Sequence, residues 1–158
     1  MKLMRKINGP ALSLSKGFTL IELLVVMAIL GVLVTIAAVG FRSSQARGRD
    51  AQRKSDLKQI SHSLELYYSD YGRYPESIPW GLEFTDEKTT YFKVVPIDPS
   101  SSFSYLYRIV LNSNYQKFQL FAYLENTQDP DLITTTYSCG TGKTCNFAIT
   151  SANTTATE

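Results

Sequence analysis

Residues 16–41 read KGFTLIELLVVMAILGVLVTIAAVGF, and the run from Phe18 to Phe41 is apolar almost throughout. A helix of this length, rising about 1.5 Å per residue, spans the roughly 30 Å hydrocarbon core of a membrane. One carboxylate, that of Glu22, lies a single turn inside the run. A charge within a membrane helix is costly and usually has a partner, although a residue this close to the end can also reach back to the headgroups. The stretch therefore predicts a membrane helix, residues 18–41, with an unexplained carboxylate.

Signal-peptide cleavage after this run is a weaker interpretation. A secretory signal peptide carries an apolar stretch of about 7–15 residues before its cleavage site, and the present run is longer. Residues 35–40, TIAAVG, nevertheless resemble a weak cleavage site. A cleaved, secreted protein therefore stays a minor alternative.

The remainder of the 158-residue chain is long enough for one compact head and too short for two. Its composition, with ten Tyr and eight Phe in the whole chain, is typical of a folded protein. The last residues, SANTTATE at 151–158, predict a flexible tail.

Charge is distributed in blocks along the chain. Four basic residues precede the apolar run, residues 42–58 hold six basic and two acidic residues, and residues 59–158 hold six basic and eleven acidic residues. Because Lys and Arg flank the run on both sides, the positive-inside rule does not fix the orientation of the helix. Another feature must decide which side of the membrane holds the head.

The two cysteines supply that feature. Cys139 and Cys145 enclose the short loop GTGKT, and a disulfide closing it would persist only in an oxidising compartment. Zinc is the competing interpretation, but the single histidine, His62, does not complete a set of four ligands. The loop also imitates a phosphate-binding loop, yet it lacks the first glycine and the strand-to-helix context. A disulfide and an extracytoplasmic head are the expectation.

The junction Lys16-Gly17-Phe18-Thr19-Leu20-Ile21-Glu22, followed by LLVVMAILG, resembles the type III signal of type IV prepilins and of the pseudopilins of type II secretion. The resemblance implies a leader at residues 1–17. It implies that a prepilin peptidase cuts after Gly17 on the cytoplasmic side of the membrane and methylates the new amino terminus, Phe18.

The same resemblance implies a partner for Glu22, which pairs in that family with the terminal amine of a neighbouring subunit. An α-amino group has a reference pKa near 8, and methylation retains its charge. Two opposite charges in hydrocarbon cost less together than apart, so the pair favours assembly and sets its register more securely than it adds net stability.

The helix is predicted to continue beyond the membrane to about residue 71, since no proline occurs between Thr19 and Tyr74. Residues 42–74 form an amphipathic stalk, with apolar side chains at alternating steps of three and four: Leu57, Ile60, Leu64, Tyr67 and Tyr71. Gly72 supplies a C-cap and Pro75 prevents the helix from resuming.

Residues 75–150 predict a small β head. Residues 103–111 and 118–124 alternate around the turn Asn112-Ser113-Asn114 and so indicate an antiparallel hairpin. Further strands are expected at 132–137 and around 146–149. The fold class is therefore α+β, with a long N-terminal helix packed on a small antiparallel sheet as in pilins. Residues 56–75 also resemble the segment shared by the major pseudopilins and related short pilins.

The sequence gives only weak signals for two binding functions. The basic stretch 42–58 could neutralise phosphates of DNA, but no aromatic residues interleave with it beyond Phe41. A solvated face, a face touching headgroups, or pairing with acids on adjacent heads explains it more simply. Asp98, Asp129 and Asp131 imitate the calcium loop of the major pseudopilins, but two acids flanking Pro130 more often form a turn, and calcium needs six to eight oxygens. No metal or cofactor is expected.

Nothing in the head places a nucleophile beside a base, so the chain is not expected to be an enzyme. The leading hypothesis is a structural subunit of a type IV pilus or pilus-like filament. Its expected partners are the prepilin peptidase, identical subunits, the assembly machinery with its minor pilins, and membrane lipids. It would lie in the inner membrane before assembly, and afterwards in an extracellular or periplasmic filament. The alternatives are the major pseudopilin of a type II secretion system and a membrane-anchored binding module that never polymerises.

Overall fold

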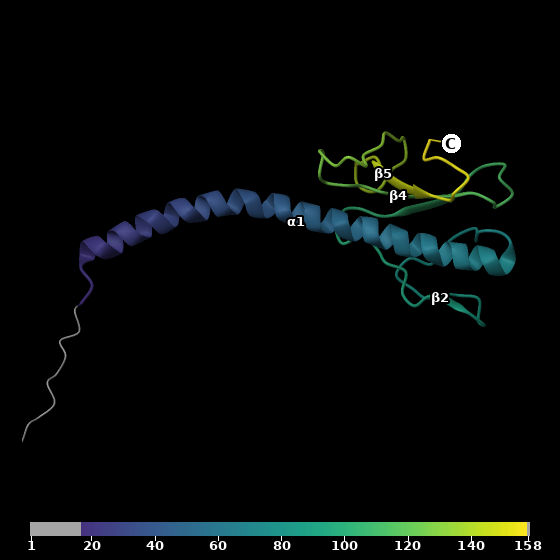
Figure 1. The fold of residues 1–158 in the computed structure, drawn as a ribbon, viewed down its shortest axis with the longest axis horizontal. Helices are drawn as coiled ribbons and strands as arrows, with labels where there is room; N and C mark the ends of the chain where they lie inside the picture. Colours follow the sequence, from purple (N-terminus) through teal and green to yellow (C-terminus); the bar gives the residue numbers. More distant parts are fainter. Residues whose placement is uncertain (1–16, 158) are drawn as a thin grey trace, which may run out of the picture. The chain divides into compact units, whose positions relative to one another are not determined.

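The computed structural model describes residues 17–157, with the backbone alone for residues 37–39 (Figure 1). The predicted leader therefore lies outside the described residues except for Gly17, and so does Glu158. Contacts within the chain divide it into two compact units between Gly40 and Phe41.

Helix α1 runs from Leu20 to Tyr71 and confirms the long helix predicted over about 19–71. It ends where the sequence places a glycine. Gly72 has a φ of 66°, a conformation that side chains rarely tolerate, and its N–H donates to the carbonyl of Tyr68 at 2.7 Å. This is the expected C-cap.

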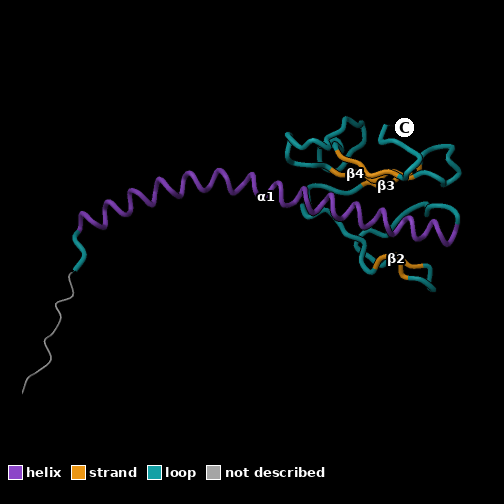
Figure 2. Tube along the Cα trace, viewed as in Figure 1, coloured by secondary structure: helices purple, strands orange, loops and turns teal. Residues whose placement is uncertain are grey.

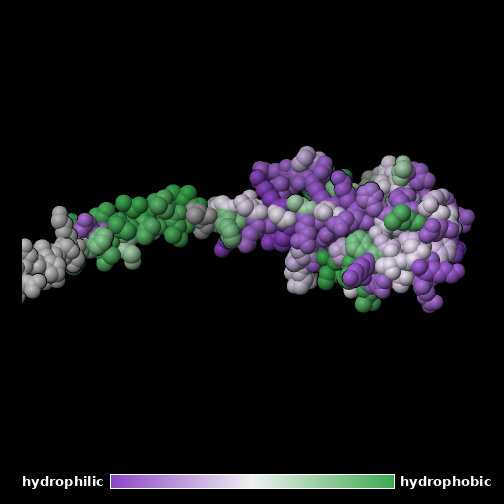
Figure 3. All heavy atoms as spheres, turned by 60° about the horizontal axis from the view of Figure 1, so that its bottom comes forward, coloured by the Kyte–Doolittle hydropathy of each residue, from purple (hydrophilic) through white to green (hydrophobic). Residues whose placement is uncertain are grey.

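The first unit consists of residues 17–40, in which the described side chains are exposed. By length and composition, α1 is long and apolar enough to cross a membrane, and no part of its most apolar window is buried by the rest of the described chain. Figure 3 shows this part of the helix as a nearly unbroken hydrophobic surface. Such a surface requires lipid or other helices around it.

In the second unit, α1 lies between two small sheets (Figures 1 and 2). One sheet has the order β3-β4-β5, formed by Leu106–Ile109, Phe118–Ala122 and Phe147–Thr150. Its pairs are antiparallel, with Leu106 opposite Phe121 and Gln119 opposite Thr150. The other sheet is a hairpin of β1, Phe84–Thr85, and β2, Thr90–Phe92. The predicted α+β class and the predicted hairpin around residue 113 are confirmed.

The core forms where the apolar stripe of α1 meets both sheets. Leu57, Ile60 and Leu64 are at most 2% exposed, and they belong to one cluster with residues of the two sheets: Phe84, Tyr91, Phe118, Leu120 and Phe147. Every residue of β4 is buried, because both faces of the strand are covered. Helix α1 packs on one face, and Cys139 and Cys145 pack against Phe121 on the other. The stripe predicted from the sequence is therefore the contact face of the helix.

Three details differ from the sequence predictions. The strand expected at 132–137 is wrong: its backbone makes isolated bonds, such as Ile133 N–H to the carbonyl of Asn146 at 2.8 Å, without a ladder. The hairpin of β1 and β2 was not predicted, since its strands are too short to show alternation. The tail expected to be flexible instead packs on β4 in the described part, where the Gln119 amide donates to the carbonyl of Thr155 at 2.5 Å.

Candidate functional site

The amino-terminal end of α1 is closed by a reciprocal pair of hydrogen bonds between Thr19 and Glu22. The N–H of Glu22 donates to Thr19 Oγ1 at 3.3 Å, and the N–H of Thr19 donates to Glu22 Oε2 at 3.0 Å. The Thr19 hydroxyl also donates to Oε2, at 2.7 Å. This is a capping box, which satisfies two backbone donors that the helix itself leaves unpaired. Glu22 therefore has a partner within its own chain before any neighbour arrives.

The bond between Gly17 and Phe18 precedes this cap. Residues 17–19 are not helical, and the first backbone bond of the helix joins Leu23 N–H to the carbonyl of Thr19 at 3.2 Å. The side chain of Phe18 is 85% exposed. The predicted processing bond thus lies in non-helical, uncovered backbone one residue before the N-cap.

The guanidinium of Arg53 is fully buried in the head, with a side chain that is 0% exposed. It forms a bidentate pair with Asp98, from Nε to Oδ2 at 2.8 Å and from Nη2 to Oδ1 at 2.9 Å. Its Nη1 donates to Asp50 and to Glu125, each at 2.8 Å. Three carboxylates hold its charge and raise the pKa of Arg53 against the opposing effect of burial. Arg53 joins the helix to two separate loops of the head.

Asp50 and Arg49 complete this ion cluster. Arg49 donates to Glu125 at 2.7 and 2.6 Å, and its hydrogen bonds, with those of Arg53, lower the pKa of Glu125 to about 2. Asp50 accepts the backbone N–H groups of Glu125 and Asn126 at 2.9 and 2.8 Å. The loop after β4 is therefore fixed to the helix both by ion pairs of its Glu125 side chain and by hydrogen bonds from its backbone to Asp50.

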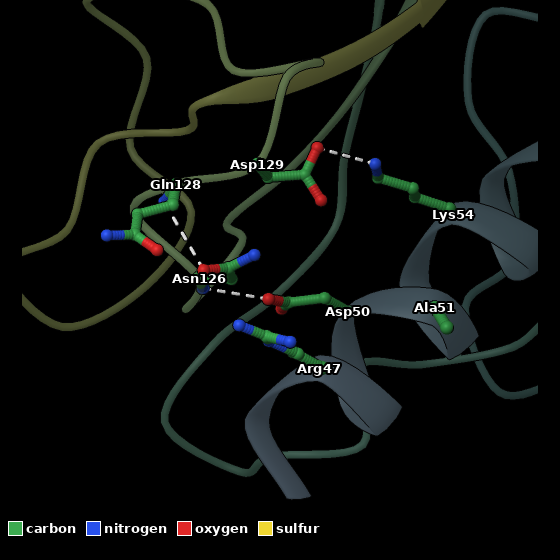
Figure 4. A pocket seen from close by; sticks show the side chains of 7 residues that line it. All are labelled: Arg47, Asp50, Ala51, Lys54, Asn126, Gln128 and Asp129. Carbon is green, nitrogen blue, oxygen red and sulfur yellow. Dashed lines mark hydrogen bonds and ion pairs between the residues drawn. The ribbon is translucent and has the colours of Figure 1, made fainter. Parts of the chain in front are cut away.

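Lys54 follows Asp50 by one turn of α1, and its side chain lies between two carboxylates. Its ammonium donates to Asp129 Oδ1 and to Asp131 Oδ2, both at 2.6 Å. Burial opposes the charge of Lys54, but these bonds raise its pKa and lower that of Asp129. Figure 4 shows Lys54 and Asp129 on the wall of a cavity of about 400 Å³, whose other lining groups are Arg47, Asp50, Ala51, Asn126 and Gln128.

These contacts correct one prediction and bear on another. The basic stretch was expected to be a solvated or headgroup-touching face, but Arg53 and Lys54 point into their own head and are neutralised there. Asp98 and Asp129, which imitate calcium ligands in the sequence, instead form ion pairs with Arg53 and Lys54, respectively. A side-chain ammonium occupies the place between Asp129 and Asp131 where a cation would lie.

The cysteine loop packs beside this cluster. Cys139 and Cys145 are joined in a disulfide with a Cα–Cα distance of 5.0 Å, and both are buried. Gly140 and Phe103 form a β-bridge, and the Ser104 N–H donates to the carbonyl of Cys139 at 2.9 Å. The ring of Phe103 lies 5.2 Å from the guanidinium carbon of Arg53. The cystine thus supports the aromatic ring that packs against Arg53.

Sequence reasoning missed the capping box and the ion cluster. The capping box was visible as T-x-x-E at residues 19–22, directly before the apolar run. The ion cluster gave a weaker signal, since Arg53 and Lys54 pair with acids 45 to 77 residues later. His62, the remaining candidate metal ligand, is exposed on α1, and no group of three or more His, Cys, Asp or Glu suited to a metal occurs within residues 17–157.

Comparisons with known proteins point to the amino-terminal end and the helix. The family model for the prokaryotic N-terminal methylation motif matches residues 12–38. The chain is 39% identical over 62 residues to the type IV major pilin protein PilA of Myxococcus xanthus, covering 39% of this chain and 28% of that protein. It is 35% identical over 95 residues to the type II secretion system core protein G of Pseudomonas aeruginosa, covering 52% of this chain and 66% of that protein.

A further relative extends the similarity into the head. The core protein G of Dickeya chrysanthemi is 28% identical over 120 residues, covering 68% of this chain and 76% of that protein. The match spans less than two thirds of the Myxococcus pilin and of the Pseudomonas core protein. No solved structure gave a significant match.

Proposed function

We propose that this chain, which belongs to the family of type IV pilins and type II secretion pseudopilins, is a structural subunit of a type IV pilus or pilus-like filament. The observation that carries the proposal is the methylation motif at residues 12–38, with Gly17 and Phe18 directly before the capped helix. A prepilin peptidase cuts after Gly17 and methylates Phe18. The mature chain then begins at Phe18, inside the exposed, non-helical segment 17–19.

Assembly proceeds through the apolar half of α1. The exposed hydrophobic surface of residues 18–36 is stable in lipid, and in a bundle of identical helices it is buried again without water. Glu22 guides this step. Its described hydrogen bonds all end on Oε2, so Oε1 is available to accept from the terminal amine of a neighbouring subunit while the capping box persists. The amine and the carboxylate pair because each is costly alone in hydrocarbon.

The subunit lies in the inner membrane before assembly, with the head on the extracytoplasmic side where the cystine of the head is stable. It then enters an extracellular or periplasmic filament with identical subunits, through the assembly machinery and its minor pilins. Membrane lipids surround the apolar half until that point. Because all the relatives named above are pilins or secretion-system core proteins, an enzymatic role is not proposed.

The runner-up is the major pseudopilin of a type II secretion system. It is favoured by the extent of the matches: the core proteins G align over 52% and 68% of this chain, whereas the Myxococcus pilin aligns over 39%. The similarity to the core proteins therefore includes part of the head. The two functions share the same processing and the same helix packing, and they differ in the filament that the heads build.

Mass spectrometry of the native protein tests the processing step. The expected mature amino terminus is Phe18 carrying one methyl group, and any other terminus would contradict the proposal. Glu22→Val tests assembly, with Ile21→Val as a matched control in the neighbouring apolar position. The Glu22 variant should be cleaved normally and form few or no filaments, while the Ile21 variant should form them as the unmodified chain does. Normal cleavage with no filaments from the unmodified chain would favour the non-polymerising membrane-anchored module.

A further inference from the structure

The loop between β3 and β4 is held in a strained and fixed conformation. Three of its residues that are not glycine, Asn112, Asn114 and Tyr115, have φ values of 60°, 50° and 62°. Asparagine tolerates this left-handed conformation in turns, whereas Tyr115 adopts it rarely and keeps it only when the surroundings enforce it. The Gln116 amide donates to the carbonyl of Gly72 at 2.7 Å, and the Tyr74 N–H donates to the carbonyl of Tyr115 at 2.9 Å. The loop is therefore fastened to the end of α1.

This fixed loop presents an uncovered apolar side chain. Leu111 is 79% exposed, and Tyr115 beside it is 36% exposed. A flexible loop would lose conformational freedom on binding, whereas a loop already fixed by Gln116 would lose little. Leu111 thus has the properties of a preformed contact residue.

A groove that could receive such a side chain lies elsewhere on the same unit. It has a volume of about 330 Å³, and its lining is largely apolar and aromatic: Trp80, Ile97, Asp98, Ser100, Ser101, Phe103, Ser104 and Tyr105. Its charged lining residue, Asp98, is already paired with Arg53. Its wall is stiff because the cysteine loop bonds to residues 102–104. An apolar side chain can therefore enter without opposing a charge, and Figure 3 shows apolar patches among polar ones on the head.

The loop and the groove cannot meet within one chain. The loop is bonded to Gly72, and the groove adjoins Asp98, which is bonded to Arg53. A step of nineteen residues at about 1.5 Å each separates Arg53 from Gly72, so the two points of attachment lie about 28 Å apart along the axis of α1. Two different surfaces on one molecule form a heterologous contact, which repeats without closing when the copies are displaced along an axis.

We propose that Leu111 of one copy packs into the groove of a second copy displaced by about 28 Å along the helix axis. The inference rests on the proposed function, because it describes a contact between heads in the filament. One inserted leucine and the residues around the groove bury far less surface than the roughly 1,200–2,000 Å² that a stable protein–protein interface buries. The contact therefore forms between heads that helix packing already holds together, and it sets which neighbours touch.

Cross-linking in assembled filaments tests this contact. In the double variant Leu111→Cys with Ser101→Cys, oxidation should give a ladder of dimers, trimers and longer chains on a non-reducing gel. Each single variant should stay monomeric, because neither new thiol meets its own copy. The pair Leu111→Cys with His62→Cys should also stay monomeric, since His62 is exposed on α1 outside the groove. The native cystine is buried and remains bonded to itself.

Substitution of Leu111 gives the second measurement. Leu111→Ser should reduce the amount of filament by about tenfold, the factor expected when a buried leucine contact is lost. Leu111→Met keeps an apolar side chain and should assemble like the unmodified chain. Filaments of the double-cysteine variant that do not cross-link would overturn the proposed contact while leaving the proposed function intact. Absence of filaments from the unmodified chain would overturn both.

Discussion

The guanidinium of Arg53 and the carboxylate of Asp98 form a buried bidentate pair, with N–O distances of 2.8 and 2.9 Å and side chains 0% and 1% exposed. Asp98 follows Pro96 in an extended segment, so the pair fastens an otherwise irregular part of the head to the helix. Burial of two charges is costly, and the pair is stable because Arg53 donates further hydrogen bonds to Asp50 and Glu125.

Arg53→Met removes the cation and leaves Asp98 and Asp50 buried without it. The free energy of unfolding should fall by about 3–5 kcal/mol, which is the usual cost of breaking a buried pair. Chemical unfolding of the full chain in detergent micelles measures this change. Lys58→Met, at an exposed position on the same helix, should change it by at most about 0.5 kcal/mol. Equal effects of the two substitutions would contradict the assigned role of Arg53.

Glu125→Gln tests the charge of the cluster through acid unfolding. The pKa of Glu125 is lowered from 4.5 to about 2, so its ionised form stabilises the fold fully above pH 4.5 and progressively less as the pH falls toward 2. The stability of the variant should therefore depend less on pH between these values. Glu76→Gln, an exposed substitution, should keep the full pH dependence.

Removal of divalent cations should not alter the stability of the head, because Lys54 supplies the positive charge between Asp129 and Asp131. The melting temperature of the unmodified chain should be the same in EDTA and in millimolar calcium. Lys54→Met leaves the two carboxylates facing each other without a cation, so the melting temperature of this variant should fall. A drop in the melting temperature of the unmodified chain in EDTA would contradict this assignment.

Thr19→Val separates helix capping from assembly. The variant loses the hydroxyl that accepts from Glu22 N–H, so the first turn of α1 should be destabilised by about 1 kcal/mol. Faster hydrogen exchange at residues 20–23 in micelles measures this fraying. Cleavage after Gly17 should persist, because the bond already lies outside the helix. If exchange there is unchanged, Thr19 is not the cap of this helix in solution.

The long helix and the central hairpin were predictable because their signals are local and repeated. Leu57, Ile60 and Leu64 recur at helical spacing, and Gly72 and Pro75 mark the end. The strand expected at 132–137 failed for a physical reason: four threonine and isoleucine residues favour extended backbone, but this segment bonds to Asn146 and Cys145 singly rather than in a ladder.

The residues of the candidate site also differ in how far the sequence predicts them. Gly17, Phe18 and Glu22 stand within seven consecutive residues, and the roles predicted for them rest on the resemblance of that stretch. The partners of Arg53 come from two loops that the sequence does not place, and a cluster of basic residues carries no information about which acids it meets. Charge counts predicted an exposed face, which holds for Arg42, Arg47 and Lys58 but not for the buried Arg53, since such counts ignore pairing within the chain.

The ion pairs that fasten α1 to the head also set an order of events. Arg53 and Lys54 pair with acids that lie 45 to 77 positions later in the chain. Strand β4 gains its second neighbour only with β5, Phe147–Thr150. Because the amino-terminal helix is made first, Arg53 and Lys54 stay without these partners until the chain has been synthesised through Asp131. A chain truncated before Asp98 would therefore retain a helix whose buried arginine has only Asp50 to pair with.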